Sequence, residues 1–139
     1  MTDVHSKEVR SYNMSRIHGK DTKPEILVRK YLFSKGLRFR KNDKRYPGHP
    51  DIVLPKYNTV VFVHGCFWHY HENCRYATMP SSNVNFWKQK LFTNRTRDKK
   101  NQDLLSNMGW KVIVVWECQL KKDTKDKTLE DLYTQIISG

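Results

Sequence analysis

Twelve consecutive residues, Val63 to Cys74, constrain this chain most, because they combine side chains that bind metal ions with side chains that transfer protons. Three of the six histidines and two of the three cysteines fall in this segment, which reads VHGCFWHYHENC. Histidine and cysteine are the main zinc ligands in proteins, and histidine is the side chain best suited to proton transfer near neutral pH. We therefore predict a metal site fused to an active site, which the rest of the fold must hold in place.

The composition of the chain indicates a basic domain whose partner is a polyanion. The 139 residues include 26 Lys and Arg against 14 Asp and Glu, a formal net charge of +12. Such a charge is typical of proteins that bind nucleic acid, although a merely soluble basic protein is the alternative. No apolar run approaches the roughly 18 residues that span a bilayer, and the first residues lack the layout of a signal peptide. We expect a cytoplasmic protein with reduced thiols and no membrane partner.

The hydrophobic patterns predict an α/β fold with a mixed sheet: a polar, basic arm over residues 1–20, then one domain over residues 21–139. The predicted strands 51–54 and 59–64 flank a short turn and should pair as a hairpin. This pairing brings Asp51 near His64 at the open end of the hairpin. The most apolar strand, residues 110–116, is predicted to be central in the sheet. The predicted strands are 37–40, 51–54, 59–64 and 110–116, and the long helix is 82–108.

The first helix of the domain has clear start and stop signals. Thr22 and Glu25 form a capping box, and Gly36 ends the helix. Its inward face is predicted to carry Leu27 and Tyr31, with Val28 a further candidate. A final amphipathic helix is predicted after a cap at Thr128.

The cysteines form the first group that could carry chemistry. Cys66, Cys74 and the distant Cys118, with one histidine, offer three thiolates and one imidazole, a closed tetrahedral set for zinc. Four protein ligands leave no position for water, so the site would be structural. Spacing does not decide which histidine is the ligand, but His71 lies closest to Cys74. The alternative is that the cysteines bind no metal, and are two incidental thiols and one buried cysteine.

The second group centres on Asp51, which follows a proline and opens one strand, and on His64, which ends the next. A Pro-Asp pair before a β-hairpin, with a helical acid upstream, resembles the active site of restriction-type nucleases, in which a carboxylate holds Mg²⁺. In such sites a second acid and a lysine stand on the next strand, where this chain has Phe62 and His64. Asp51 is then left to hold the metal, with Glu25 in an outer role, and His64 and His69 take the place of the lysine.

With these residues in view, the chain resembles the very short patch repair (Vsr) mismatch endonucleases from about Asp3 to Leu120. The most specific part is the run His64-Gly65-Cys66-Phe67-Trp68-His69. The family implies a restriction-endonuclease-like, PD-(D/E)XK-type core with a structural zinc site. It also implies a Mg²⁺-dependent enzyme that nicks one DNA strand on the 5′ side of the thymine in a T:G mismatch, the product of 5-methylcytosine deamination. The other matching motifs are Asn13-Met14, Asp21-Thr22, Pro47 to Asp51, Phe86-Trp87, Gly109-Trp110 and Val115 to Cys118.

The resemblance also implies roles for single residues. Asp51 would bind Mg²⁺ beside the backbone carbonyl of Val63, which stands where a threonine is familiar, and Glu25 would be a supporting acid. The implied catalytic histidines are His64 and His69, and the implied zinc ligands are Cys66, His71, Cys74 and Cys118.

Further side chains are implied to contact DNA. Phe67, Trp68 and Trp87 would wedge into the duplex beside the mismatch from the major groove, and Met14 and Ile17 would enter the minor groove. The implied contacts from the long helix are Lys90 and Asn94. A wobble pair is weakly stacked, so a wedge costs less there than in matched DNA. On this interpretation Trp68 is exposed in the free protein.

Two other functions stay open at this point. A zinc-stabilised DNA-binding module without chemistry would need the same charge and aromatics, but no acid facing a phosphate. A restriction-type endonuclease that cuts intact sequence would keep the chemistry and change the substrate. We expect a monomer, because a nick in one strand needs no two-fold axis.

Overall fold

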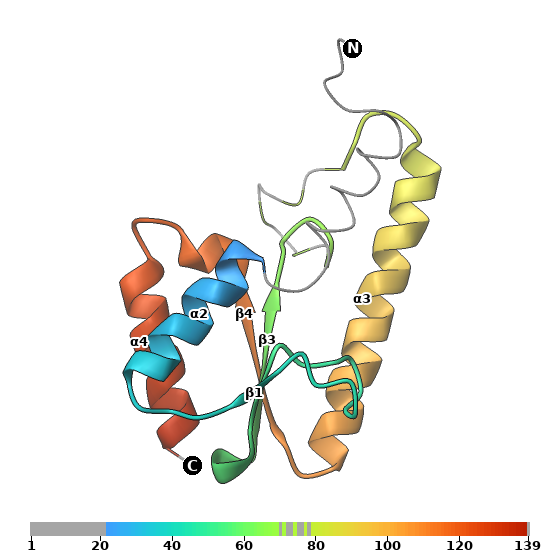
Figure 1. Ribbon diagram of the computed structural model, residues 1–139. Helices are drawn as coiled ribbons and strands as arrows, with labels where there is room; N and C mark the ends of the chain where they lie inside the picture. The colour runs from blue at the N-terminus through green and yellow to red at the C-terminus, as the bar shows by residue number, and fades with distance from the viewer. Residues whose placement is uncertain (1–21, 70, 72–73, 75–76, 78, 139) are drawn as a thin grey trace, which may run out of the picture.

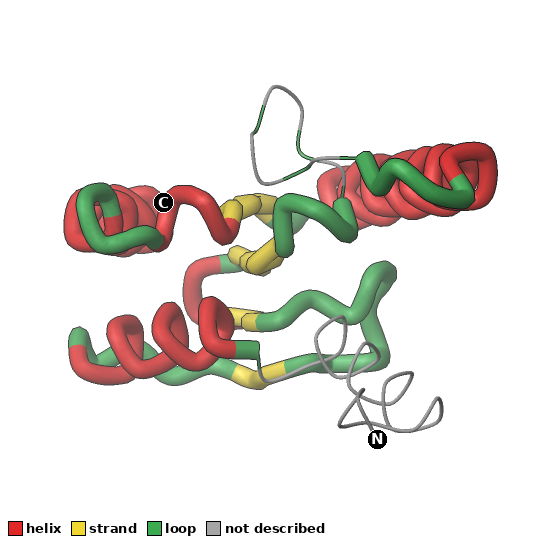
Figure 2. The backbone as a smooth tube through the Cα atoms, turned by 90° about the horizontal axis from the view of Figure 1, so that it is seen from above, coloured by secondary structure: helices red, strands yellow, loops and turns green. Residues whose placement is uncertain are grey.

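The computed structural model describes residues 22–69, 71, 74, 77 and 79–138, and these form three layers. A sheet lies in the middle, with α2 (Lys23–Ser34) and α4 (Lys125–Ile137) on one face and α3 (Val84–Asn107) on the other (Figure 1, Figure 2). The predicted mixed α/β architecture is confirmed. The arm 1–20, with Met14 and Ile17, lies outside the described residues. Within them, no helix combines the length and the apolar character needed to cross a membrane.

Over the described residues the sheet has four strands, in the order β1-β2-β3-β4. The first two pairs are antiparallel, and β3 and β4 are parallel, joined through α3. The predicted hairpin is therefore confirmed, but the prediction that the most apolar strand is central is wrong: β4 lies at an edge of this sheet and β3 inside it. Every residue of β3 is buried, whereas β4 is mostly half-buried. The strands are β1 (Arg40–Lys41), β2 (Ile52–Leu54), β3 (Thr59–His64) and β4 (Lys111–Trp116).

The alternation of side chains along β3 divides the core into two clusters. Val61 and Val63 pack with residues of α2 and α4, whereas Val60 and Phe62 pack with Leu105 of α3. Successive side chains of a strand point to opposite faces, so each of these apolar positions has a helix to cover it. Helices thus cover both faces of β3, and this packing fixes the position of His64 at the end of the strand.

The first helix begins and ends as its sequence predicts. At its end, Leu37 N donates to Leu32 O at 3.1 Å and Gly36 N donates to Phe33 O at 3.0 Å, the pattern of a Schellman motif with glycine at a positive φ of 86°. Leu37 belongs to this cap, and its side chain is buried in the core. Of the predicted strand 37–40, only Arg40 is therefore in a strand, the short β1.

Two predictions about helix faces and starts are wrong in detail. In α2 the fully buried apolar side chains are Val28 and Leu32, whereas Leu27 and Tyr31 are half-buried at the margin of the same cluster. The final helix, α4, begins at Lys125 after Thr124, one turn before the predicted cap at Thr128. No glycine or proline separates Thr124 from Thr128, so the helix extends through the charged residues between them.

The loop between β1 and β2 leans on α3 at Gly48. This glycine has φ 78°, and a Cβ atom on it would lie 3.1 Å from Asn101 Cβ and 3.2 Å from the Phe62 ring. Positive φ and close approach both require glycine here. The loop and α3 both line a cleft, together with the start of α2 and the end of β3.

Substituting Gly48 with alanine is therefore expected to lower the free energy of unfolding by about 2–4 kcal/mol, since left-handed strain and overpacking add. Gly36→Ala is the matched control, because Gly36 also has a positive φ, but a Cβ atom on it would have no described residue within 4 Å. It should lose only about 1–2 kcal/mol. Urea unfolding of both variants measures the difference, and equal losses would contradict the close contact.

Candidate active site

Asp51 stands at the start of β2, opposite the end of β3. The register pairs Ile52 with Val61, so the Asp51 side chain reaches the last residues of the neighbouring strand. Its Oδ2 atom accepts a hydrogen bond from the Val63 backbone N–H at 2.6 Å. The hairpin thus fixes one oxygen of the carboxylate beside Val63, at the end of β3 where His64 also lies.

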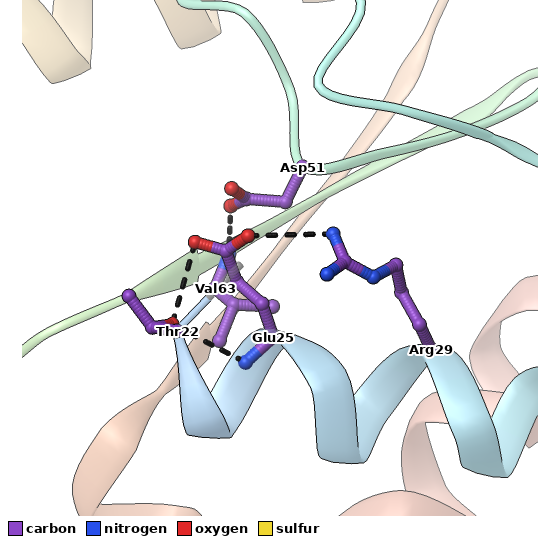
Figure 3. Close-up of polar contacts among 5 residues, drawn as sticks. All are labelled: Thr22, Glu25, Arg29, Asp51 and Val63. Atoms are coloured by element: carbon purple, nitrogen blue, oxygen red, sulfur yellow. Dashed lines mark hydrogen bonds and ion pairs between the residues drawn. The ribbon is translucent and has the colours of Figure 1, made fainter. Parts of the chain in front are cut away.

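Glu25 approaches Asp51 from the first turn of α2 (Figure 3). Thr22 Oγ1 donates to Glu25 Oε1 at 3.3 Å, and Arg29 Nη1 donates to Glu25 Oε2 at 3.4 Å. Thr22 also caps the helix by accepting a hydrogen bond from Glu25 N. Glu25 and Arg29 are both buried, so the start of the helix delivers a held carboxylate to the same place as Asp51.

The neighbourhood of these two acids changes the proton affinity of Asp51. Burial, and then repulsion from Glu25, raise the pKa of Asp51 to about 7, against the opposing hydrogen bond from Val63 N–H. A bound cation would offset both the burial of the Asp51 charge and its repulsion from Glu25. This pair of acids is therefore suited to bind a cation. Carboxylate and carbonyl oxygens are the donors that Mg²⁺ prefers, so this oxygen-only set fits that ion.

His64 and His69 stack face to face beside the acids. Their ring centroids are 3.8 Å apart and the planes differ by 4°. Burial, and then the neighbouring His69, lower the pKa of His64 to about 3, so this imidazole is neutral near pH 7. Its Nδ1 atom is buried without a hydrogen-bond partner among the described residues. His69 differs, because its Nδ1 atom is hydrogen-bonded to the carboxylate of Asp98.

Asp98 is the site residue that sequence reasoning missed. It lies on α3, 29 residues after its partner His69, in the stretch 93–100 whose other charged residues are all basic. One signal in the sequence points to it, because it is the one acid in that stretch. In the structure it continues the inward face of α3 set by Leu91 and Asn94. An acid on a buried helix face usually has a partner.

The four side chains predicted to be catalytic line one cleft. Among the residues of its surface are Glu25, Asp51, His64, His69 and Asp98. Lys44 from the loop and Arg97 from α3 add positive charge to its walls. The cleft therefore combines a pair of acids, a pair of imidazoles and basic flanks, a set that suits hydrolysis of a phosphodiester.

A second group of side chains lies next to this cleft. One donor atom from each of the predicted zinc ligands, Cys66, His71, Cys74 and Cys118, lies within 4.8 Å of the others. Three sulfurs and one imidazole are the donor set of structural zinc sites, so the group fits zinc. Burial raises the pKa of the Cys66 thiol to about 12, and a thiolate there calls for a bound cation. The group joins the loop after β3 to the end of β4.

The aromatic side chains predicted to wedge into DNA form one cluster, but they are not fully exposed. Trp68 is half-buried, and its ring lies 5.1 Å from that of Phe67 and 5.9 Å from that of Trp87, between centroids. Its backbone carbonyl accepts a hydrogen bond from Asn94 Nδ2 at 3.1 Å. The expectation of an exposed Trp68 is therefore only partly met, because Asn94 and Trp87 of α3 brace it.

The two α3 residues implied to contact DNA have different surroundings. Lys90 is exposed, as a phosphate or base contact requires. Asn94 is buried, with 4% of its surface exposed, and its amide oxygen accepts a hydrogen bond from Arg97 Nη2 at 2.9 Å. In the free protein Asn94 thus holds the Trp68 segment, and a DNA contact by Asn94 stays a prediction.

Comparison with known proteins agrees with these observations. A family model described as DNA mismatch endonuclease Vsr matches residues 2–75. The type II nicking enzyme V.NmeAIP of Neisseria meningitidis is 58% identical over 121 residues, covering 87% of this chain and 86% of that protein. The DNA mismatch endonuclease Vsr of Escherichia coli K12 is 40% identical over 141 positions, covering 100% of this chain and 90% of that protein. On the family match and these identities, the chain belongs to the Vsr family of DNA mismatch endonucleases.

Proposed function

We propose that this chain is a Mg²⁺-dependent DNA mismatch endonuclease that nicks one strand on the 5′ side of the thymine in a T:G mismatch, and so initiates very short patch repair. The observation that carries the proposal is the meeting of the Glu25–Asp51 acid pair with the His69–Asp98 pair in one cleft. The names of the relatives support mismatch and nicking activity. The core would be restriction-endonuclease-like, and the enzyme would act as a monomer on double-stranded DNA.

Asp51 and the backbone carbonyl of Val63 would hold the magnesium ion, with Glu25 as the supporting acid. When bound, Mg²⁺ supplies Lewis-acid stabilisation of the charge that develops on the phosphate during strand cleavage. Glu25 keeps the ion's side of the cleft negative without leaving its own partners, Thr22 and Arg29.

The two histidines would have separate roles. The Nδ1–H of His69 donates to Asp98, which leaves the lone pair on Nε2 to accept a proton from the attacking water. Asp98 then stabilises the imidazolium that forms. The buried, neutral His64 stacks on His69 and serves as a hydrogen-bonding group rather than as a cation, because two charged rings in contact would repel each other.

The zinc ion would be structural. Cys66 follows His64 by two residues, and Cys118 follows the end of β4, so the four ligands brace the segment that carries His69 and Trp68. With four protein donors the site has no position for substrate.

The proposal is tested by a nicking assay on three oligonucleotide duplexes that share one sequence. One contains a T:G pair, one is fully matched, and one contains a different mismatch; each is incubated in Mg²⁺ and in EDTA. A Mg²⁺-dependent nick 5′ of the thymine in the first duplex alone is the expected result. Several relatives are named type II nicking enzymes, so a nick in matched DNA is the specific alternative, and binding without a nick would leave a non-catalytic module.

The pH dependence of nicking should reflect proton competition at Asp51. The pKa of this buried carboxyl is raised from 3.8 to about 7, so its protonated form dominates below about 7 and its ionised form above. At limiting Mg²⁺ the rate is therefore expected to fall as the pH drops from about 8 to about 6, and saturating Mg²⁺ should move the midpoint to lower pH. Single-turnover rates over a grid of pH and Mg²⁺ measure this. A midpoint independent of Mg²⁺ would contradict competition at a metal ligand.

Removal of the Trp68 ring should affect mismatch binding more than stability. Trp68→Ala is expected to weaken binding to the T:G duplex by about 1–3 kcal/mol, the usual worth of stacking on a base. Its stability cost should stay below the roughly 3–5 kcal/mol of a fully buried aromatic, because the ring is half-buried. Binding to matched DNA should change little. Phe92→Ala is the control, since Phe92 is an aromatic residue of α3 with 68% of its surface exposed. A large fall in melting temperature with unaltered mismatch preference would identify Trp68 as core.

A further inference from the structure

Arg29 is a buried cation that the chemistry above does not use. It lies one helical turn after Glu25 on α2, and only 9% of its surface is exposed, against 3% for Glu25. Arginine is rarely buried unless it is paired, because the loss of hydration is costly. A surface position on the same helix would have avoided that cost, so the location of this guanidinium needs an explanation.

The cleft lies on the other side of Glu25. The described residues that line it include Thr22, Lys23, Pro24 and Glu25 from the start of α2, and Arg29 is not among them. Substrate in the cleft therefore meets the Glu25 carboxylate, and Arg29 stands behind it. A role in which Arg29 touches the reacting atoms does not fit this arrangement.

The two oxygens of Glu25 are held by different groups (Figure 3). Thr22 Oγ1 donates to Oε1 at 3.3 Å, and Arg29 Nη1 donates to Oε2 at 3.4 Å. One donor on each oxygen fixes the rotation of the carboxylate about its Cγ–Cδ bond. Removal of Arg29 takes away the contact on Oε2, so the carboxylate is held less firmly in this orientation.

The charge of Arg29 also bears on Asp51. Glu25 and Asp51 line the same cleft, and the Arg29 guanidinium lies 3.4 Å from the Oε2 atom of Glu25. Two carboxylates side by side in a buried site repel each other, and a fixed cation behind one of them reduces that repulsion. Arg29 thus allows both acids to stay in one cleft.

From this geometry we propose that Arg29 is a positioning residue of the active site, which orients Glu25 and offsets its charge so that Asp51 and Glu25 together accept one divalent cation. The inference deepens the proposed function and rests on it. A purely structural ion pair is the competing explanation, and it would contribute to folding without any effect on metal affinity.

The test is a double-mutant cycle with Glu25. Arg29→Met keeps the length of the side chain and removes its charge, and Glu25→Gln keeps the shape of the carboxylate. Three quantities are measured for the wild type, both single variants and the double variant: the Mg²⁺ affinity by calorimetry without DNA, the single-turnover nicking rate against Mg²⁺, and the melting temperature. Arg29→Lys, which keeps the charge, is the conservative variant.

In a protein that contains Glu25, Arg29→Met is expected to weaken Mg²⁺ binding and raise the Mg²⁺ needed for half-maximal nicking by about 10–100-fold, as for groups that orient a metal ligand. Arg29→Lys should restore most of the affinity. In the Glu25→Gln background the same change should add less than about threefold, because the group through which Arg29 acts is then neutral.

Equal losses in both backgrounds, or a lower melting temperature with unchanged Mg²⁺ affinity, would overturn the proposal. Should Arg29→Met fail to fold, Arg29→Gln replaces it, since it retains a donor for Glu25 and lacks the charge. The calorimetry keeps the two proposals apart. A wild type that binds Mg²⁺ but nicks no T:G duplex would refute the proposed function, and the affinity cycle would still decide the role of Arg29.

Discussion

Asp51→Asn is expected to abolish nicking while leaving the fold and DNA binding intact. The amide keeps the shape of the carboxylate, and its oxygen still accepts the hydrogen bond from Val63 N–H, but the charge proposed to attract the metal is lost. A loss on the order of 10³-fold in the single-turnover rate is expected, comparable to removal of a principal charge-stabilising group from an active site. The measurement is the nicking rate on the T:G duplex at saturating Mg²⁺, with DNA affinity measured in parallel.

The matched control for this substitution is Asp103→Asn. Asp103 lies on α3, where it forms an ion pair with Lys99 one helical turn before it, and its side chain is 63% exposed. The change in net charge is the same, so any general electrostatic effect on DNA binding appears in both variants. Normal nicking by Asp51→Asn, or an equal loss in the control, would refute the role of Asp51 as metal ligand.

Cys118→Ser is expected to release the zinc ion proposed for the cysteine group and to unfold much of the protein. Structural zinc sites contribute apparent binding free energies of about 10–16 kcal/mol, which is as large as the whole net stability of a typical domain, about 5–15 kcal/mol. Cys118 comes from the end of β4 and its three partners from the loop after β3, so its loss separates the two segments. Elemental analysis and thermal unfolding measure the effect.

His69→Ala provides the contrast. His69 is hydrogen-bonded to Asp98 and lies outside the cysteine group, so this variant is expected to keep one zinc per chain and its fold while it loses activity. Loss of zinc from His69→Ala alone would show that the ligand set is assigned wrongly. Retention of zinc by a stable Cys118→Ser protein would show that the cysteine group is not a structural metal site.

Local signals predicted the parts of the fold that depend on neighbours in the chain. The cap at Thr22, the stop at Gly36 and the β2–β3 hairpin all follow from short stretches of sequence and are all present. The position of β4 in the sheet was predicted wrongly. A continuous run of apolar residues indicates that both faces of a strand are covered by helices. It does not indicate whether the strand has a neighbouring strand on one side or on both.

The candidate site divides in the same way. Asp51 and His64 were predictable because the hairpin that brings them together is local. Asp98 stands out in the sequence as the one acid in a basic stretch, but its contact with His69 was not predictable, because that contact depends on how the long α3 packs across the sheet. The bracing of Trp68 by Asn94 also depends on that packing, so the half-buried state of this ring could not be inferred from its neighbours.

The cleft draws its chemistry from segments that are far apart in the chain. Glu25 comes from α2, Asp51 from the start of β2, His64 from the end of β3 and Asp98 from the middle of α3. These groups meet only where α2, the β2–β3 hairpin and α3 pack together. On the proposed function, a nascent or partly folded copy would lack the assembled site and would not cut DNA. The topology would thus make nuclease activity depend on completion of the fold.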